Sequence, residues 1–388
     1  MNASKNIALG EMMASKLGSV DPSKFTEEIF DLYSIPAFDN GEPEIVAGAK
    51  IGSVKQIVQP GDVLLSKIVP HIRRTWIVGE HKGRRIIASG EWIVFRSRRI
   101  EPRYLRHILV SDIFHAQFMR TVSGVGGSLL RARPAQVASI EITLPTLEEQ
   151  ERIAEVLDRA EELRSKRREA IAQLDTLTQA IFLEMFGDPV TNSKGWTSKA
   201  LTDVCYCYSG GTPSKSNDAY WQGTLPWFSA KDLKLNDLFD SQDHINEDIP
   251  AKTTLRLLPE NTVVIVVRGM ILAHTFPISV LRVPATINQD LKALLPNETL
   301  EAQFLAASLR SVAAFALQQV SEAAHGTKRL DAEGLRKIPI ILPPLALQKE
   351  FAQRVEAVEK LQASHRASLS ELDALFASLQ HRAFRGEL

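Results

Sequence analysis

One amphipathic segment occurs twice in this sequence, and the repeat constrains the fold more than any other feature. LPTLEEQERIAEVLDRAEELR occupies residues 144–164 and LPPLALQKEFAQRVEAVEKLQ occupies residues 342–362. Matched residues lie 198 positions apart; they are Leu144/Leu342, Pro145/Pro343, Gln150/Gln348, Ala154/Ala352, Glu161/Glu359 and Leu163/Leu361. The chain is therefore expected to use one structural unit twice.

Each copy predicts the start of a long helix. In the first copy, T-L-E-E at 146–149 is typical of a capping box, with Thr146 as the N-cap and Glu149 three residues later. Apolar or small side chains then recur at steps of four and three residues, and Gly187 with Pro189 indicates the end. We expect about 40 helical residues, or roughly 60 Å at 1.5 Å per residue. The second copy keeps the same register.

A helix of this length cannot bury its apolar stripe alone, so the two copies are expected to pair as a coiled coil. Because a whole module separates them, an antiparallel, pseudo-twofold pair is the simplest arrangement. The residues predicted to pair are Ile153, Leu157, Arg164, Arg167, Ile171 and Leu174 in the first helix, and Phe351, Val355, Gln362, His365, Leu369 and Leu372 in the second.

Four of these pairing positions are polar and lie near the helix midpoints, namely Arg164, Arg167, Gln362 and His365. An antiparallel pair would bring the two midpoints together. The four residues then either form a polar layer that fixes the register or extend their long side chains out of the seam to water.

The repeat divides the chain into four parts and predicts an α+β fold. Two modules, 1–143 and 190–341, alternate with two helices, 144–189 and 342–388. Short β-like runs fill the modules, at 49–58, 62–69, 75–80, 84–89, 92–97, 262–269 and 278–283. In each module a helical stretch follows (101–120, 300–320), and then a loop with glycine and basic residues (123–134, 321–334).

Motifs of catalysis are absent from the sequence. It contains no P-loop, no H-E-x-x-H, no G-x-S-x-G and no Cys/His set with zinc spacing. We therefore predict a protein that is not an enzyme and has no metal and no cofactor. Cys205 and Cys207 are interpreted as small core residues in a reducing compartment, with a metal or redox site as the alternative.

The chain also lacks a signal peptide and an apolar run of membrane-spanning length, which predicts a soluble cytoplasmic protein with no membrane partner.

Charge is distributed unevenly although the formal net charge is zero. Residues 66–133 contain 14 Lys and Arg against 4 Asp and Glu, whereas residues 146–189 contain 6 against 11. The second module, over 190–340, is balanced at 15 each. The basic stretch is typical of a phosphate-binding surface; the alternative is a solvated charged face.

Several strings, together with the repeated helix, resemble one known family. They are GGTPSKSNDAYWQGTLPWFSAKDL (210–233), VVRGMI (266–271) and ATINQDLKALLP (285–296), with PGDVLLSKIVPHIRRTWIV (60–78) in the first module. In this order they resemble the specificity (S) subunit of Type I restriction–modification systems, over essentially the whole chain. The first module departs from the family pattern because it has no equivalent of G-T-P-S…Y-W-x-G.

The resemblance implies a non-catalytic reader of double-stranded DNA. Each module would be a target-recognition domain for one half of a bipartite target, and the helices would act as a spacer. Two modification (M) subunits would carry S-adenosylmethionine and methylate adenine, and restriction (R) subunits would add cleavage with ATP and Mg. The alternative is a stand-alone DNA-binding scaffold or regulator without methyltransferase partners; an unrecognised nuclease ranks last.

In DNA-binding proteins some residues bind phosphates and others bind base edges, and this suggests particular contacts here. The expected phosphate contacts are Lys82, Arg84, Arg85, Lys328 and Arg329. The expected base contacts are Lys67, His71, Arg73 and Arg74 in the first domain, and Thr212, Ser214, Lys215, Ser229, Lys231 and Arg268 in the second.

The roles of five further residues each have two possible interpretations. Trp221 and Trp227 are interpreted as core residues, with DNA contact as the alternative. Asn288, Gln289 and Asp290 either reach DNA or form a turn.

Overall fold

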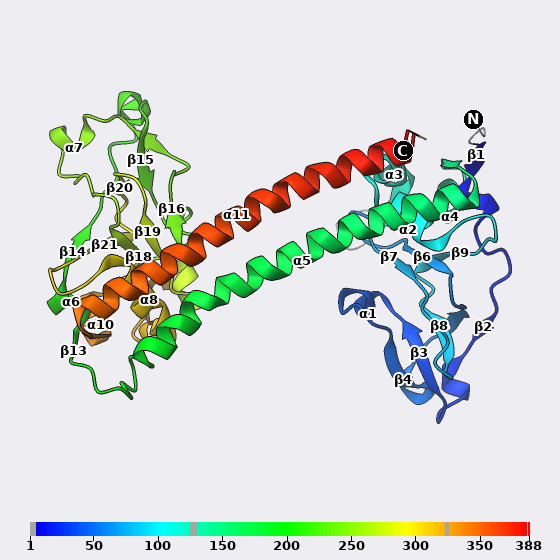
Figure 1. Cartoon of the computed structure of the whole chain (residues 1–388), viewed down its shortest axis with the longest axis horizontal. Helices are drawn as coiled ribbons and strands as arrows, with labels where there is room; N and C mark the ends of the chain where they lie inside the picture. The colour runs from blue at the N-terminus through cyan, green and yellow to red at the C-terminus, as the bar shows by residue number, and fades with distance from the viewer. Residues whose placement is uncertain (1–4, 125–129, 323–325, 386) are drawn as a thin grey trace. The chain divides into compact units, whose positions relative to one another are not determined.

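The computed structural model describes residues 5–124, 130–322, 326–385 and 387–388 (Figure 1). The loops expected at 123–134 and 321–334 therefore lie partly outside the described residues. The chain forms two compact units. The first consists of Met1–Arg168 and Ala367–Leu388, and the second of Glu169–Arg366. Each unit thus contains one module and one part of both long helices.

The two long helices lie inside the predicted segments 144–189 and 342–388. Helix α5 spans Leu147–Phe186 and α11 spans Leu345–Ala383. The Thr146 hydroxyl accepts the backbone N–H of Glu149 (3.3 Å), as expected for an N-cap. The Glu149 carboxylate binds Arg152 (2.7 Å), so only one half of the capping box is formed by these side chains. After α5, Gly187 has φ +77°, the left-handed conformation of a helix terminator.

The helices pair in opposite directions, as the second unit shows directly. Gln362 donates to Asp175 (3.0 Å), and further along α5 the ring of Phe182 meets that of Phe351 (5.6 Å between centroids). The residue number on α5 rises while that on α11 falls, so the pair is antiparallel. Arg366 also contacts Asp175 (3.4 Å).

The first unit repeats these contacts with the two helices exchanged. Arg164 contacts Asp373 (2.6 Å), and Arg168 contacts the same carboxylate (3.2 Å). Asp373 lies 198 residues after Asp175, as Gln362 lies after Arg164. The contacts within the two units therefore follow the sequence repeat.

Of the polar residues predicted in the seam, Arg164 does not extend to water. Its side chain is only 17% exposed and lies over the Phe376 ring, 4.2 Å from the centroid. Gln362, Arg167 and His365 are half-buried. Among the other predicted pairing residues, Ile153, Leu157, Phe351 and Val355 are buried, and Ile171, Leu174, Leu369 and Leu372 are half-buried.

The first module combines a five-stranded and a three-stranded sheet with short helices. The larger sheet, of order β2-β5-β8-β3-β4, contains β2 (Ser19–Val20), β3 (Ile29–Tyr33), β4 (Glu44–Ala47), β5 (Lys55–Ile57) and β8 (Arg85–Ala88). The smaller, of order β7-β6-β9, contains β6 (Val63–Ser66), β7 (Thr75–Ile77) and β9 (Trp92–Phe95). The other elements include the pairs β1 (Lys5–Ala8) with β12 (Glu141–Leu144) and β10 (Val122–Ser123) with β11 (Arg131–Ala132), and helices α1 (Ile35–Asp39), α2 (Pro102–Val110), α3 (Asp112–Phe118) and α4 (Pro134–Val137).

The second module also combines a five-stranded and a three-stranded sheet, but β18 (Val263–Val266), the counterpart of β6, lies in the larger sheet. Its five-stranded sheet, of order β14-β21-β18-β19-β16, contains β14 (Cys205–Ser209), β16 (Asp237–Leu238), β18 (Val263–Val266), β19 (Ile278–Leu281) and β21 (Leu291–Pro296). A three-stranded sheet of order β17-β15-β20 contains β15 (Leu225–Phe228), β17 (His244–Ile245) and β20 (Thr286–Ile287). The remaining elements are the pairs β13 (Ser198–Ala200) with β24 (Pro339–Ile341) and β22 (Ser321–Glu322) with β23 (Lys328–Arg329), and helices α6 (Leu201–Val204), α7 (Ile249–Lys252), α8 (Ala302–Ser311), α9 (Ala313–Gln318) and α10 (Ala332–Lys337).

Three predicted elements differ from the structure, and one of them is the helical stretch at 300–320, which divides at Val312 into α8 and α9. The run at 49–58 is strand only at its end, where β5 begins after a short 3-10 helix, Gly48–Lys50. The helical stretch at 101–120 breaks at Ser111, because the Ser111 hydroxyl accepts the N–H of Phe114 and caps a new helix (3.3 Å).

Cys205 is buried, and burial raises the pKa of its thiol to about 12. Both cysteines are free thiols. A thiol with so high a pKa is protonated at neutral pH, and metals and oxidants react with the thiolate, which favours the core interpretation.

The repeated glutamine fastens each module to its long helix. Gln150 has no exposed surface, and its side-chain oxygen accepts the N–H of Glu101, the residue that caps α2 (2.9 Å). Its amide nitrogen donates to the carbonyls of Pro145 (3.0 Å) and Arg99 (3.2 Å). One buried amide thus joins the module to the entrance of α5.

Gln348 repeats this arrangement in the second unit. Its oxygen accepts the N–H of Glu301 (2.9 Å), and its nitrogen donates to Pro343 (2.8 Å) and Thr299 (3.0 Å). Glu301 caps α8 as Glu101 caps α2. The repeated L-P…Q string is therefore explained by a buried joint as well as by a helix.

Candidate nucleic-acid interface

The loop after β6, residues 67–74, contains four of the residues expected to contact bases. This loop follows a strand whose residues are all buried. A β-bridge between Ile68 and Arg131 of β11 holds its start. Val69 has φ +46°, which is strained for a β-branched side chain, and its N–H donates to Leu130 (3.1 Å). The backbone of the loop is thus fixed at its first residues.

Two arginines of this loop are bound to other parts of the first module. Arg73 contacts Asp112 (2.6 Å) and donates to the Val110 carbonyl (3.1 Å). Arg74 forms two hydrogen bonds with Asp39, both 2.9 Å, and its side chain is only 10% exposed. Both arginines therefore position the loop. Between Lys67, which is half-buried, and these arginines, His71 is exposed.

The expected phosphate contacts of the first module lie on the larger sheet and beside it. Arg84 binds Asp31 of β3 (2.7 Å), and Arg85 binds Glu28 (2.8 Å) with its guanidinium 4.7 Å from the Phe25 ring centre. Lys82 is exposed.

These pairings correct the charge interpretation. The acidic partners of Arg74, Arg84 and Arg85 come from residues 28–39, before the basic stretch begins. Asp62 likewise binds Arg96 (2.6 Å). Much of the excess of positive charge over 66–133 is therefore compensated inside the first module, and the free cationic surface is smaller than the sequence predicts.

In the second unit, the structure brings three expected residues together. A bridge joins the backbones of Arg268 and Arg329, and the N–H of Gly269 donates to Lys328 (3.0 Å). Both arginine residues are exposed, and neither forms an ion pair within the described residues. Lys328 binds Glu322 (2.8 Å).

The remaining expected residues of the second module gather around the two tryptophans. Trp221 and Trp227 meet edge to face with centroids 5.1 Å apart, and Trp227 is buried while Trp221 is half-buried. Lys215 and Asp243 line an open pocket of about 460 Å³ beside them, and Lys231 binds Asp243 (2.7 Å).

Hydrogen bonds assign further roles in this region. The Ser214 carbonyl accepts the indole N–H of Trp221 (3.2 Å), and the Ser214 and Ser216 hydroxyls are 2.8 Å apart. Ser229 is buried, and its N–H and hydroxyl both donate to Asp232 (2.8 and 2.9 Å). Ser229 is therefore held in a turn, and a contact of Ser229 with DNA stays a prediction.

The turn 288–290 connects Thr212 with Arg268. Asn288 is buried and accepts the N–H of Asp290 (3.0 Å), which is the structural role considered for it. Gln289 is exposed and accepts the Thr212 hydroxyl (2.6 Å), whereas the Asp290 carbonyl accepts the N–H of Arg268 (3.2 Å). Thr212, Gln289 and Arg268 thus form one continuous polar edge.

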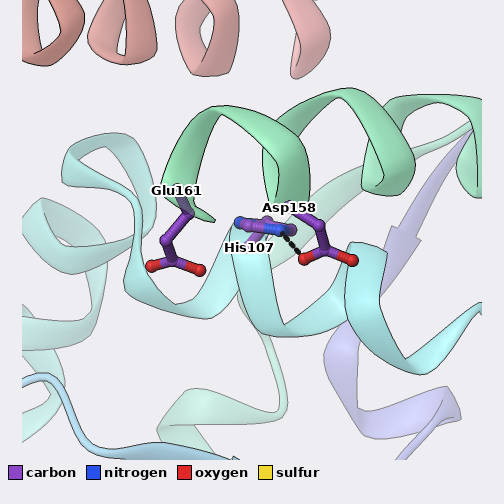
Figure 2. A group of neighbouring side chains, drawn as sticks. All are labelled: His107, Asp158 and Glu161. Atoms are coloured by element: carbon purple, nitrogen blue, oxygen red, sulfur yellow. Dashed lines mark hydrogen bonds and ion pairs between the residues drawn. The ribbon is translucent and has the colours of Figure 1, made fainter. Parts of the chain in front are cut away.

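A polar cluster of one buried and two half-buried side chains joins α2 to α5 in the first unit, and these side chains are of metal-binding type. Figure 2 shows His107 of α2 between Asp158 and Glu161 of α5, with ligand atoms within 4.8 Å of one another. The ring nitrogen Nε2 of His107 lies 2.7 Å from Asp158. Burial lowers the pKa of His107, and the nearby charge of Arg106 acts in the same direction.

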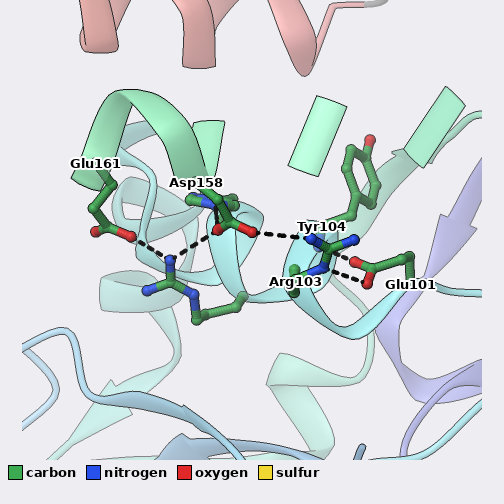
Figure 3. Close-up of polar contacts among 7 residues, drawn as sticks. Glu101, Arg103, Tyr104, Asp158 and Glu161 are labelled. Atoms are coloured by element: carbon green, nitrogen blue, oxygen red, sulfur yellow. Dashed lines mark hydrogen bonds and ion pairs between the residues drawn. The ribbon is translucent and has the colours of Figure 1, made fainter. Parts of the chain in front are cut away.

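Arginines already neutralise the carboxylates of this cluster. Arg106 binds both Glu161 and Asp158, and Arg103 links Asp158 (3.4 Å) with Glu101 (2.9 Å) (Figure 3). Since guanidinium groups supply the positive charge, we interpret the cluster as a structural joint. It explains why Glu161 belongs to the repeat.

The second unit has a matching joint at Glu359. Arg282 contacts Glu359 (3.3 Å) and Asp237 (2.7 Å). Burial raises the pKa of Glu359, with Asp237 acting in the same direction.

Sequence reasoning missed the apolar anchors of the second unit. Phe182 and Phe186 of α5 are fully buried and pack against Phe304 and Phe351, with centroids 4.9 to 5.6 Å apart. Their spacing of four residues was a usable signal. Also missed were exposed apolar side chains in the loops after β6 and β18: Ile72 (43%), Met270 (62%) and Ile271 (45%).

Two α+β modules fastened to one antiparallel helix pair, with polar and basic loops at the ends of buried strands, define a nucleic-acid-reading scaffold. The family model for the Type I restriction modification DNA specificity domain matches residues 4–173 and again 193–374. The chain belongs to this family, whose members provide the DNA specificity of Type I restriction–modification systems.

Relatives agree with this assignment. The specificity subunit of the Type I restriction enzyme EcoR124I/EcoR124II of Escherichia coli is 30% identical over 164 residues, which are 42% of this chain. The match spans 41% of that relative's length. The HindI specificity subunit of Haemophilus influenzae is 19% identical, over 87% of this chain and 88% of its own.

Solved structures share the fold. A chain from a study of complex assembly and conformational transition of the type I R-M system has a TM-score of 0.64 and 23% identity, covering 100% of this chain and 99% of its own. The S subunit of a Type I system from M. genitalium has a TM-score of 0.58 and 12% identity, covering 98% and 96%.

Among the described residues, no helix has both the length and the apolar character needed to cross a membrane.

Proposed function

We propose that this chain reads a bipartite target in double-stranded DNA, with one half-site for each module, and presents that target to catalytic partner subunits in the cytoplasm. The observation that carries the proposal is one frame used twice with different loops. Gln150 and Gln348 fasten the two modules in the same way. The loops that follow β6 and β18 differ at most positions, as two readers of different half-sites should.

Exposed leucines on the coiled coil support the binding of two copies of one partner. In the first unit Leu163 and Leu375 are 49% and 50% exposed, and each directly precedes a residue of the Arg164–Phe376 contact. We infer that these exposed leucines belong to a docking surface for the partner.

The second unit has the same surface. Leu177 and Leu361 are 38% and 47% exposed, and they lie 198 residues from Leu375 and Leu163 respectively. Two exposed leucines per unit, related by the repeat, suit two identical partners. We assign these places to two modification subunits, with restriction subunits joining the assembly.

In this proposal the chain contributes position and no catalytic group. Base chemistry needs a flipped adenine in a methyltransferase pocket, and that pocket with S-adenosylmethionine belongs to the modification subunits. ATP and Mg belong to the restriction subunits.

The test is co-expression of the full chain with its modification subunits, followed by mapping of methylated adenines in the host DNA. We expect one bipartite motif with two defined halves and an unspecified spacer of constant length. A folded complex that contains the modification subunits and methylates nothing would overturn the proposal.

A further inference from the structure

Both modules present apolar side chains on the loop that leaves their central buried strand. Strands β6 and β18 are buried at every position. In the loop after β6, Ile72 is 43% exposed; in the loop after β18, Met270 and Ile271 are 62% and 45% exposed. Exposed apolar side chains in corresponding loops of two dissimilar modules call for a common explanation, although the position of Ile72 corresponds to Leu272, which is buried.

The two loops are built alike. Val69 donates its N–H to Leu130 (3.1 Å), and Gly269 donates to Lys328 (3.0 Å). Both residues have positive φ, +46° and +139°. A turn hydrogen bond then returns to each of them, from Ile72 (3.0 Å) and from Leu272 (3.2 Å).

The neighbouring strands also form corresponding hydrogen bonds with the two loops. Ala132 of β11 donates to the Lys67 carbonyl (2.7 Å), and Leu330, just after β23, donates to the Val267 carbonyl (2.9 Å). These bonds hold the exposed apolar residues on a fixed backbone, which lowers the entropic cost of using them in binding.

Basic side chains flank the apolar residues. In the second module Arg268 and Arg329 are exposed and form no ion pair within the described residues. In the first, the Arg131 side chain is 59% exposed, although it contacts Glu91 (3.1 Å). An apolar tip between cations matches duplex DNA, where phosphates flank base edges that include the thymine methyl group.

We propose that Met270 and Ile271 in the second module, and Ile72 in the first, are specificity residues that pack against base edges while the flanking arginines bind phosphates. This inference rests on the proposed function, because it names the elements that would read each half-site. Arg73 and Arg74 act as positioning residues for Ile72, since their ion pairs hold the loop to α1 and α3.

The test uses the full complex with modification subunits and two variants, Met270→Ala with Ile271→Ala, and Ile72→Ala. The first variant should lower methylation of the wild-type motif about tenfold or more, and relax the second half-site only. Ile72→Ala should relax the first half-site only. Matched controls are Leu235→Ala (68% exposed) and Ile45→Ala (66% exposed), which remove apolar surface elsewhere in the same modules and should change neither half-site.

Salt dependence separates the two kinds of contact. Arg329→Ala should reduce the dependence of DNA affinity on salt by about one phosphate contact. The Met270→Ala, Ile271→Ala variant should weaken binding at every salt concentration without changing this slope.

The failures are distinguishable. If the wild-type complex assembles but methylates no bipartite motif, the proposed function fails. If the wild type does methylate one, unchanged motifs in the loop variants, equal loss at both half-sites, or loss of assembly overturns the assignment of these residues.

Discussion

The two units share their frame and differ in their loops. Gln150 and Gln348 make corresponding hydrogen bonds to a capping glutamate and a proline carbonyl, with distances that agree within 0.2 Å. In contrast, the loop KIVPHIRR at 67–74 corresponds to VRGMILAH at 267–274. The repeated residues hold the modules in place, and the residues that differ are those to which we assign the reading of DNA.

A second difference lies in the helix pair. Arg164 forms an ion pair with Asp373, whereas Gln362, its counterpart, donates a hydrogen bond from an uncharged amide to the Asp175 carboxylate. The two contacts occupy equivalent places and should respond differently to salt.

The largest effect is expected from removing the buried glutamine. Gln348→Ala leaves the N–H of Glu301 and the carbonyls of Pro343 and Thr299 without their buried partner, which costs about 3 kcal/mol. Gln150→Ala should cost about as much, and thermal unfolding of the full chain measures both. Gln353→Ala, on the exposed side of α11, is the control. A loss no larger than the control's would show that the joint is unimportant.

Release of the loop after β6 is expected to have the next largest effect. Arg74→Ala removes two hydrogen bonds to Asp39 from a side chain that is 10% exposed, so the loop becomes mobile. We expect methylation of the wild-type motif to fall roughly tenfold, because recognition of the first half-site is weakened. This fall corresponds to a loss of about 1.4 kcal/mol in transition-state stabilisation. Arg98→Ala removes the same charge at an exposed position and is the control. Equal loss at both half-sites would contradict independent modules.

One substitution can make the contact between the long helices in the first unit the same as that in the second unit. Arg164→Gln copies the second unit and should cost about 1 kcal/mol, because an ion pair with Asp373 and a cation–π contact with Phe376 are lost. Thermal unfolding at low and high salt should show that the difference in stability between the wild type and the variant becomes smaller as the salt concentration rises. A variant with unchanged stability and salt response would show that the ion pair contributes nothing.

The smallest effect concerns pH. The folded first unit favours neutral His107, because burial and Arg106 lower its pKa, while Asp158 and Glu161 oppose the shift. The unfolded chain binds the proton near the usual pKa of about 6.5, so stability is full above that pH and falls as the pH drops below it.

His107→Gln keeps a hydrogen-bond donor for Asp158 and removes the titration. Denaturant unfolding at pH 7.5 and 5.5 should therefore show a smaller loss in this variant than in the wild type. His381→Gln changes an exposed histidine and should behave like the wild type. Identical pH dependence in all three proteins would exclude His107 as the cause.

The long helices and their pairing were predictable from the sequence. The repeat at 198 residues and the apolar period determine both, because helical periodicity is local in sequence. Gln150 and Gln348 were visible as a matched pair, but their role was not. Their partners Arg99 and Thr299 lie 51 and 49 residues away in the chain.

The site was less predictable for the same physical reason. A count of charged residues over 66–133 could not include Glu28, Asp31 and Asp39. Strand pairing and helix packing bring these carboxylates to the arginines of the basic stretch. Nor could the count reveal the strained φ of Val69 or the exposure of Met270, since both depend on tertiary contacts.

The most direct test of the central claim exchanges one module and maps methylation. The region 190–341 is replaced by the corresponding region of another specificity subunit of known target, and the complex with modification subunits is expressed. The account predicts that one half of the motif changes to that of the donor, while the other half stays. A motif that changes in both halves, or an assembled complex that loses all methylation, would contradict two independent readers on one frame.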